Sequence, residues 1–228
     1  MLKKIRKSQN AFAYTLLAPS IILLVALIGY PMIYNIMISA QKEPLNPKLE
    51  SVFVGLDNFK EVLADKEFYS SVLITIAFTF VVVVLSTILG LAMACFLNRE
   101  FVGKKLVNAL VILSYVVPSV CLIFCWRYMF NNIYGIINYF LVDILHVVDK
   151  APLWFDSPVS AFVLVALFNV WRFFPYAYMS FMAIMTSIDK SLYEAADIDG
   201  ASKWQKFKAV TYPAIKPTMV TVVSLRMI

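Results

Sequence analysis

The sequence predicts an all-α protein whose helices cross a membrane. Of its 228 residues, 61% are hydrophobic and 15% are charged, whereas a soluble domain averages about 45–50% and about 25%. The apolar residues gather into long runs without acidic side chains, and these runs lack the alternation of membrane-barrel strands. Only helices and closed barrels satisfy every backbone polar group in lipid. A polytopic bundle of transmembrane helices is therefore predicted.

Four runs are long enough to cross a bilayer, because a spanning helix needs roughly 20 apolar residues. They cover residues 11–41, 68–98, 106–126 and 157–188. A fifth run begins at Pro217 and stops at Ile228, which is too short to cross. We therefore expect four complete spans and the start of a fifth, in a sequence that is a piece of a longer chain.

Three residues within the spans are expected to shape the helices. Pro31 and Pro118 should kink theirs, and Gly90 should allow two helices to approach closely. The cysteines also lie within spans, where we interpret them as small apolar residues and not as disulfide partners or metal ligands; they are Cys95, Cys121 and Cys125.

The distribution of basic residues predicts the orientation. Segments 1–10, 99–105 and 189–216 hold twelve Lys and Arg residues, against six in segments 42–67 and 127–156. Cytoplasmic segments carry the excess of positive charge. The amino terminus is therefore expected in the cytoplasm, and the net charge of +6 follows from topology. Because the basic residues are scattered between spans, a nucleic-acid partner is not expected.

The two segments on the opposite side are predicted to contain short helices. Residues 41–67 combine a loop with an amphipathic helix that carries Phe59, Val62 and Leu63. Residues 127–156 are rich in aromatic side chains, which suit the membrane interface. We interpret the second segment as an interfacial helix that caps the bundle, with partner docking as the alternative.

The segment after the fourth span, residues 189–217, is predicted to fold as two short helices separated by a turn. The first ends at Gly200, which can adopt the left-handed conformation. The second starts at Ser202, with Gln205 completing a capping box, and presents Trp204 and Phe207 on one face. Prolines at positions 213 and 217 are expected to end it before the next span. The segment is either an ordered loop or an interface, because exposed aromatic residues commonly anchor partners.

A family resemblance begins with this segment. Glu194-Ala195-Ala196, Gly200 and Val210-Thr211-Tyr212-Pro213 resemble the EAA signature of ABC importer permeases, although that signature prefers isoleucine at position 210 and leucine at position 212. The sequence pattern YEAADIDGAS.WQ.F, from Tyr193 to Phe207, resembles the binding-protein-dependent sugar-uptake branch of this family. The stretches FVGLDNF (53–59) and 171–175 extend the likeness, which covers nearly the whole chain from Ala11 onward.

The resemblance implies a type I permease fold with about six spans in the intact protein. It implies a bacterial multi-pass membrane protein with a cytoplasmic segment 1–10 and a permease domain 11–228, in which residues 189–217 form the coupling loop. The implied partners are cytoplasmic ABC ATPase subunits, a second permease that is related but different, and an extracellular sugar-binding protein. The implied coupling residues are Glu194, Ala195, Ala196, Asp199, Gly200, Trp204, Phe207 and Pro213.

No enzymatic site is predicted. The sequence contains no nucleophile–base pair, no metal-ligand cluster and no G-x-x-x-x-G-K-[ST] phosphate loop, and Gly103-Lys104-Lys105 lacks both the earlier glycine and the hydroxyl. We therefore expect no cofactor, with ATP bound and hydrolysed by a partner subunit.

Arg172 is the candidate residue for the substrate pathway. A charged side chain in mid-span costs about 2.5–3.5 kcal/mol on insertion scales, so it should face the bundle or a wet cavity. Together with the neighbouring aromatic residues Trp171, Phe174 and Tyr176 it could bind a sugar. Alternatively, it pairs with carbonyls freed by Pro175 or with the second permease. The substrate could be a mono- or oligosaccharide or a glycerol phosphate.

Three other classes of function were weighed. A proton- or sodium-coupled transporter is disfavoured because the four spans contain no acidic residue. A membrane scaffold would not need a mid-span arginine, and an integral membrane enzyme would need a catalytic constellation.

Overall fold

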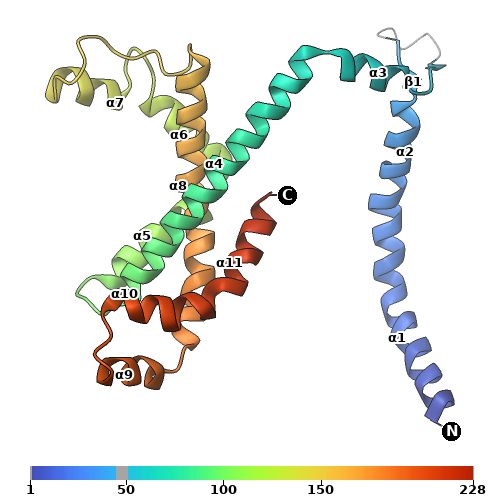
Figure 1. The fold of residues 1–228 in the computed structure, drawn as a ribbon. Helices are drawn as coiled ribbons and strands as arrows, with labels where there is room; N and C mark the ends of the chain where they lie inside the picture. Colours follow the sequence, from blue (N-terminus) through green and yellow to red (C-terminus); the bar gives the residue numbers. More distant parts are fainter. Residues whose placement is uncertain (1, 45–50, 228) are drawn as a thin grey trace. The chain divides into compact units, whose positions relative to one another are not determined.

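The computed structural model describes residues 2–44 and 51–227 (Figure 1). Helices make up almost all of this part of the chain, apart from a two-stranded hairpin and connecting loops, so the all-α prediction is confirmed. The chain divides into two compact units, Met1–Val72 and Leu73–Ile228, and the helix α4 (Lys66–Leu97) runs through the boundary.

The first unit begins with one long helical run. It consists of α1 (Leu2–Leu24), the π-helical turn η1 (Val25–Gly29) and α2 (Tyr30–Ser39). Residues 11–39 are long and apolar enough to cross a membrane, and none of the most apolar window is buried. The π turn contains Leu27, whose carbonyl lies four residues before Pro31 and cannot receive a hydrogen bond from it. The expected distortion at Pro31 thus takes the form of a π turn.

A hairpin and a short helix follow in the same unit. Strands β1 (Gln41–Lys42) and β2 (Val52–Phe53) pair antiparallel, and α3 (Asp57–Ala64) confirms the predicted amphipathic helix. The side-chain amide of Asn58 donates to the backbone oxygens of Ser39 and Gln41 at 3.0 and 2.8 Å. The FVGLDNF stretch therefore ties α3 back to the end of α2.

The core of the second unit lies where α4 meets three other helices. These are α5 (Lys104–Val116), α8 (Pro158–Ser187) and α11 (Tyr212–Met227). At Gly90 a β-carbon would lie 2.6 Å from the Ala177 Cβ and 2.8 Å from the Tyr178 backbone nitrogen. The predicted close approach at Gly90 is confirmed. The buried residues of the core are Ala94, Leu97, Val111, Phe174, Ala177, Tyr178, Phe181, Met185, Ile215 and Val222.

The stretch predicted as the third span is two helices and not one. Helix α5 is followed by α6 (Ser119–Met129), and the pair is bent by 100°. Val117 is extended, with φ −65° and ψ 138°, because the ring of Pro118 disfavours the helical conformation of the residue before it. The position of the predicted kink was right, but the helix breaks there. The described residues thus contain three helices able to cross a membrane, or four if the bent pair crosses as one span.

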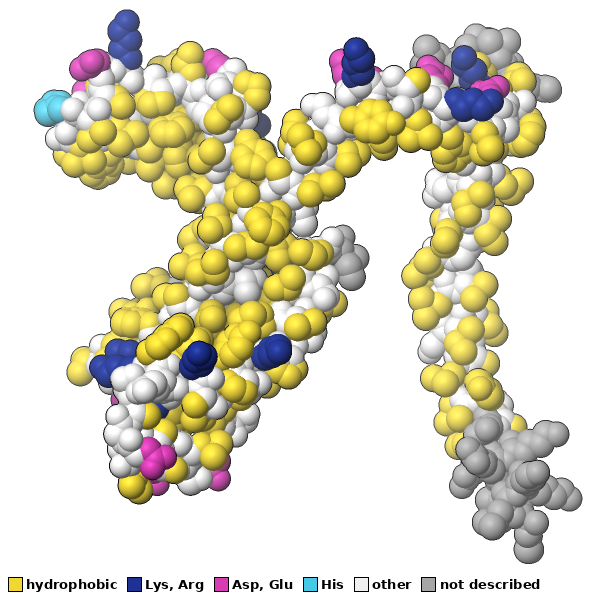
Figure 2. Space-filling model, viewed as in Figure 1, with side chains coloured by type: hydrophobic (Ala, Val, Ile, Leu, Met, Phe, Trp, Pro, Cys, Tyr) yellow, Lys and Arg dark blue, Asp and Glu magenta, His cyan; other side chains and the backbone are white. Residues whose placement is uncertain are grey.

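Between α6 and α8 lie α7 (Ile136–Tyr139), the π turn η2 (Phe140–Ile144) and loops. Asn138 holds this segment together: its side-chain oxygen accepts from the Trp154 indole at 2.7 Å, and its amide donates to the Asn131 carbonyl at 3.2 Å. In Figure 1, α7 lies at the end of the second unit opposite α9 (Lys190–Ile198). Figure 2 shows apolar side chains along the visible flanks of the long helices, with charged ones near the helix ends.

The last part of the chain is helical without interruption from Lys203 to Met227. Helix α10 (Lys203–Lys206), the π turn η3 (Phe207–Thr211) and α11 follow one another directly. The prediction that prolines 213 and 217 end the second short helix was wrong. The π turn contains Ala209, four residues before Pro213. Within this turn the Tyr212 N–H bonds to the Phe207 carbonyl, five residues earlier, so the backbone hydrogen bonds have already changed to the wider π pattern before Pro213.

Candidate functional site

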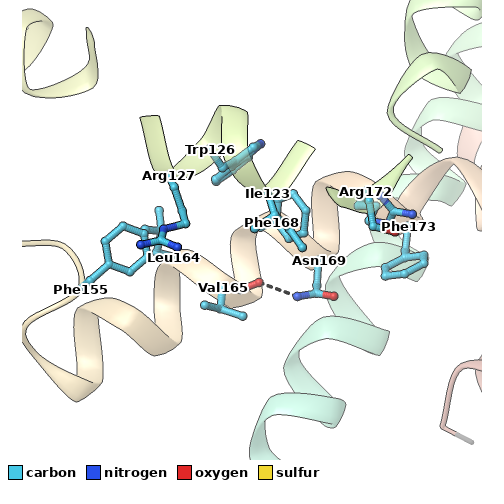
Figure 3. A pocket seen from close by; sticks show the side chains of 11 residues that line it. Ile123, Trp126, Arg127, Phe155, Leu164, Val165, Phe168, Asn169, Arg172 and Phe173 are labelled. Carbon is cyan, nitrogen blue, oxygen red and sulfur yellow. Dashed lines mark hydrogen bonds between the residues drawn. The ribbon is translucent and has the colours of Figure 1, made fainter. Parts of the chain in front are cut away.

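Helices α6 and α8 border a cavity of about 410 Å³ in the second unit (Figure 3). This volume falls in the range of small-molecule sites, about 300–1,000 Å³. Aromatic and aliphatic side chains form most of the lining, with a few polar groups among them. The lining residues are Ser119, Ile123, Trp126, Arg127, Phe155, Leu164, Val165, Phe168, Asn169, Arg172 and Phe173.

An aromatic cluster forms one wall of this cavity. The Trp126 ring meets the Phe168 ring edge to face, with centroids 5.3 Å apart, and lies 5.8 Å from the Trp171 ring. It also stacks on Phe130 at 5.2 Å. Each ring packs against rings from another helix or from the loop that follows α6. The aromatic wall is therefore preorganised for a ligand.

Two polar side chains of α8 lie on the same side of the helix as Phe168. The Asn169 amide donates to the Val165 carbonyl at 2.8 Å, which fixes its orientation and leaves its oxygen and second N–H available. The Nη1 atom of Arg172 is buried and has no hydrogen-bond partner among the described residues. Buried polar groups almost always have partners, so this donor is poised for an acceptor that the described chain does not supply.

The carbonyl freed by Pro175 does not pair with Arg172. A proline cannot donate to the residue four positions earlier, which is Trp171. The hydroxyl of Ser114, on α5, donates to the Trp171 carbonyl at 3.2 Å. The alternative in which Arg172 pairs with the carbonyl freed by Pro175 is therefore not realised at Trp171.

The structure separates the four residues predicted for the substrate pathway. Arg172 lines the cavity, and Trp171 lies beside it against Trp126. Phe174 is in the core with 7% of its surface exposed, and Tyr176 stacks on Tyr115 with centroids 6.3 Å apart.

Sequence reasoning missed three of the residues that line the cavity together with Arg172, namely Phe168, Asn169 and Trp126. Phe168 and Asn169 stand four and three residues before Arg172, so they share its helix face. That spacing was a signal in the sequence. Trp126 gave no such signal, because it comes from a different helix.

The coupling loop predicted at 189–217 has well-defined turn chemistry. Asp189 caps α9 by accepting from the Ser191 N–H at 2.9 Å, and hydrogen bonding from Ser191 lowers the pKa of the Asp189 carboxyl. Gly200 has φ +72°. The N–H of Ala201 bonds to the Ala196 carbonyl and that of Gly200 to the Asp197 carbonyl, which is a Schellman motif. The predicted left-handed stop at Gly200 is confirmed.

The predicted start of the second helix is also confirmed. The Ser202 N–H donates to the Gln205 side chain at 2.7 Å, and the Gln205 N–H donates to the Ser202 hydroxyl at 3.4 Å. The Trp204 and Phe207 rings stack with centroids 5.4 Å apart. Trp204 is 70% exposed, whereas Phe207 is partly buried against the core, so Trp204 is the ring of the pair that is open to a partner.

Two long-range contacts join α9 to the helix that follows. Lys206 forms an ion pair with Asp197, and the hydroxyls of Tyr193 and Thr211 lie 2.8 Å apart. Sequence reasoning included Thr211 in the family signature but predicted neither contact. The contacts fix the angle between the two helices, while Glu194, Ala195, Asp199 and Gly200 remain exposed.

The loop between α4 and α5 lies at the same end of the second unit as α9. Glu100 accepts a hydrogen bond from Lys104 at 2.8 Å. This bond and the positive charges of Lys104 and Lys190 lower the pKa of the Glu100 carboxyl. The basic segments 99–105 and 189–216 therefore share one end of the unit, as the orientation argument requires.

Comparisons with known proteins agree with this architecture. The family model for the binding-protein-dependent transport system inner membrane component matches residues 86–228. The inner membrane ABC transporter permease protein YcjO of Escherichia coli is 56% identical over 222 residues, which are 97% of this chain and 76% of that protein. The trehalose/maltose transport system permease protein MalF of Thermococcus litoralis is 33% identical and covers 99% of this chain and 75% of its own length.

A solved structure has the same fold. A bacterial ABC transporter involved in the import of the acidic polysaccharide alginate aligns with a TM-score of 0.81 and 20% identity, over 99% of this chain and 75% of that one. The likeness confirms the permease fold expected from the EAA signature. Taken with the family model, it makes the chain a multi-pass component of the cell membrane that serves transport and not catalysis. The chain belongs to the inner membrane components of binding-protein-dependent transport systems, as a permease subunit of an ABC importer.

Proposed function

We propose that this permease moves a carbohydrate, of oligosaccharide or related type, through the cavity between α6 and α8. The observation that carries the proposal is the composition of this cavity, where an aromatic wall faces the available groups of Asn169 and Arg172. A sugar ring has apolar C–H faces that stack on indole and phenyl rings, and a rim of hydroxyls that exchange hydrogen bonds with amide and guanidinium groups. Relatives named for trehalose, maltose or maltodextrin transport support this substrate class.

The break between α5 and α6 supports a hydrated pathway on this side of the bundle. Irregular backbone at membrane depth is tolerated only where it is buried in protein or lines a wet cavity. Ser119, the first residue of α6, lines the cavity directly after the break at Pro118. A wet cavity also accounts for the depth at which Arg172 is found.

We assign the coupling to ATP hydrolysis to the exposed side of α9 and α10. Cytoplasmic ATPase subunits would bind Glu194, Asp199 and Trp204. They would also bind the ATP, since this sequence contains no phosphate-loop motif. Because α10 continues into α11 without a break, a displacement of the loop is passed to a membrane helix.

The remaining partners and the orientation belong to the same proposal. A second permease, related but different, would complete the pore, and an extracellular sugar-binding protein would deliver substrate on the side of α7. The segment 1–10 and the coupling loop would face the cytoplasm, because they hold the excess of basic residues.

Reconstitution tests this function. The protein, purified with its co-isolating ATPase, second permease and binding protein, should accumulate labelled maltose, trehalose or a related sugar in proteoliposomes only when ATP is present. Glu194→Lys or Gly200→Pro should leave membrane insertion and assembly intact but lower uptake per ATP hydrolysed at least about tenfold, because the first reverses an interface charge and the second removes the Schellman turn.

Lys105→Glu, an exposed charge reversal outside the coupling loop and away from α7, is the matched control and should transport normally. Uptake driven by a proton or sodium gradient without ATP would contradict the function, and full coupling in both loop variants would contradict the role of the loop.

A further inference from the structure

We propose that the transported carbohydrate carries an anionic group, a carboxylate or a phosphate, and that Arg172 binds it. The inference rests on the proposed function, because it assigns a substrate class to the same cavity. It goes beyond that function in stating the charge of the substrate.

Two cationic side chains from different helices share one aromatic ring beside the cavity. The Cζ atom of Arg226, on α11, lies 3.9 Å from the centroid of the Phe173 ring, and that of Arg172 lies 5.4 Å from it. The face of the ring attracts each guanidinium. The two guanidiniums repel one another, and the repulsion is strong where water is scarce. An anion between or beside them would relieve it.

Both guanidiniums also hold unused donors. The Nη1 atom of Arg172 and the Nε atom of Arg226 are buried, and the part of the chain that the structure describes gives neither an acceptor. A buried charged donor without an acceptor is costly. Arg172 is the one of the two that lines the cavity (Figure 3), so an incoming ligand can reach it.

The charged side chains that line the cavity are all of one sign. Its lining contains Arg127 and Arg172 but no acidic side chain. The ion pairs among the described residues involve other cations, namely Lys60, Lys104 and Lys206. A neutral sugar would supply hydroxyl acceptors but no negative charge. A carboxylate or phosphate supplies both, and its geometry matches the planar fork of a guanidinium.

The test compares pairs of sugars in which one member is neutral and the other carries a carboxylate or a phosphate. The assembled importer in lipid nanodiscs is titrated with maltose and maltobionate, galactose and galacturonate, and glucose and glucose 6-phosphate, at constant ionic strength, with thermal stabilisation as the readout. For at least one pair, the acidic member should half-saturate at a concentration about tenfold lower or more, as expected for a hydrogen bond to a charged group. Sodium chloride alone should give no shift.

Variants of Arg172 then locate the effect. Arg172→Gln should bring the half-saturating concentrations of the acidic and the neutral member of a pair within about twofold of one another, and Arg172→Lys should keep part of the difference, because the charge stays but the fork is lost. Lys105→Gln, an exposed position at the start of α5, makes the same change of charge elsewhere and should behave as the unmodified protein. Arg172→Lys also provides a charged variant if the glutamine variant does not fold.

Two outcomes would overturn the inference. In one, the acidic member binds no better in any pair although neutral sugars bind and are transported, which would leave the proposed function standing. In the other, Arg172→Gln releases the second permease without changing the preference between sugars, so that a carboxylate of that subunit is the counter-charge. Binding and transport of no sugar at all would overturn the proposed function, and this inference with it.

Discussion

Ser114 illustrates how one hydroxyl allows a proline inside a membrane helix. Pro175 leaves the Trp171 carbonyl without its usual partner, and lipid offers no replacement. The Ser114 side chain reaches across from α5 and donates to that carbonyl, while it also bonds to Val111 in its own helix. Ser114 is 3% exposed, so water does not substitute for it.

A double-mutant cycle tests this pairing. Ser114→Ala should lower the free energy of unfolding by about 1–3 kcal/mol, the typical cost of a buried group left unpaired. In a Pro175→Ala background the new N–H can bond to the Trp171 carbonyl, so the same serine change should cost less by about 1 kcal/mol or more. Thermal unfolding of the purified protein in detergent measures both.

The exposed Ser187, whose hydroxyl bonds only within its own helix, provides the control: Ser187→Ala should change little in either background. An equal cost of Ser114→Ala with and without the proline would show that the two residues act independently.

At the scale of helices, the crossing of α4 and α8 depends on the absence of a side chain at Gly90. A β-carbon there would meet the Phe174 carbonyl oxygen at 2.9 Å as well as Ala177 and Tyr178. Backbone atoms cannot rotate out of the way as the end of a long side chain can. The whole of one helix must therefore shift to accept even a methyl group.

Gly90→Ala should destabilise the protein by about 1–3 kcal/mol, although alanine is favoured over glycine inside a helix by about 1 kcal/mol. Gly29→Ala is the matched control, because its β-carbon would meet only the Val25 side chain at an ordinary 3.6 Å. Thermal stability in detergent compares the two. A Gly90→Ala protein as stable as the Gly29→Ala protein would mean that α4 and α8 do not cross this closely.

The elements that sequence predicted correctly are those specified by neighbouring residues. The stop at Gly200 and the capping box of Ser202 and Gln205 depend on residues a few positions apart, so their signals are visible in the sequence. The apolar runs likewise gave the positions of the long helices, because lipid imposes one simple requirement on all of them.

The parts that sequence did not predict depend on residues far apart in the chain. Tyr193 and Thr211 are 18 positions apart, and Ser114 and Trp171 are 57 apart. Proline was recognised as a helix breaker, but whether the chain bends by 100°, as at Pro118, or continues through a π turn, as at Pro213, is decided by packing. Arg172 was identified from its cost in lipid, whereas Trp126 is brought to the same cavity from another helix only by the fold.

At the scale of the whole molecule, the ends of the second unit differ in charge. The basic segments 99–105 and 189–216 share one end, and α7 lies at the other (Figure 1). Successive connections between membrane helices must lie on opposite sides of the bilayer and every second one on the same side, so this arrangement is what a chain that crosses repeatedly requires.

Cysteine labelling in intact cells tests the orientation. After replacement of the three native cysteines, Ile133→Cys should react with a membrane-impermeant maleimide added outside, because Ile133 is 92% exposed at the α7 end. Ser202→Cys should react only after the membrane is permeabilised. The reverse pattern would place the amino terminus and the coupling loop outside the cell.

The unbroken helical run from Lys203 to Met227 also sets a limit on engineering. Residues 189–202 resemble a cassette that could be exchanged for that of another importer, in order to redirect the permease to a foreign ATPase. The cassette has only one free boundary, at Ile188, because its other side is continuous with α10, η3 and α11, and because Tyr193 within it is bonded to Thr211 of η3. A working graft therefore has to include the π turn and the first turn of α11, so that the foreign loop keeps its own continuous connection to the helix that follows it.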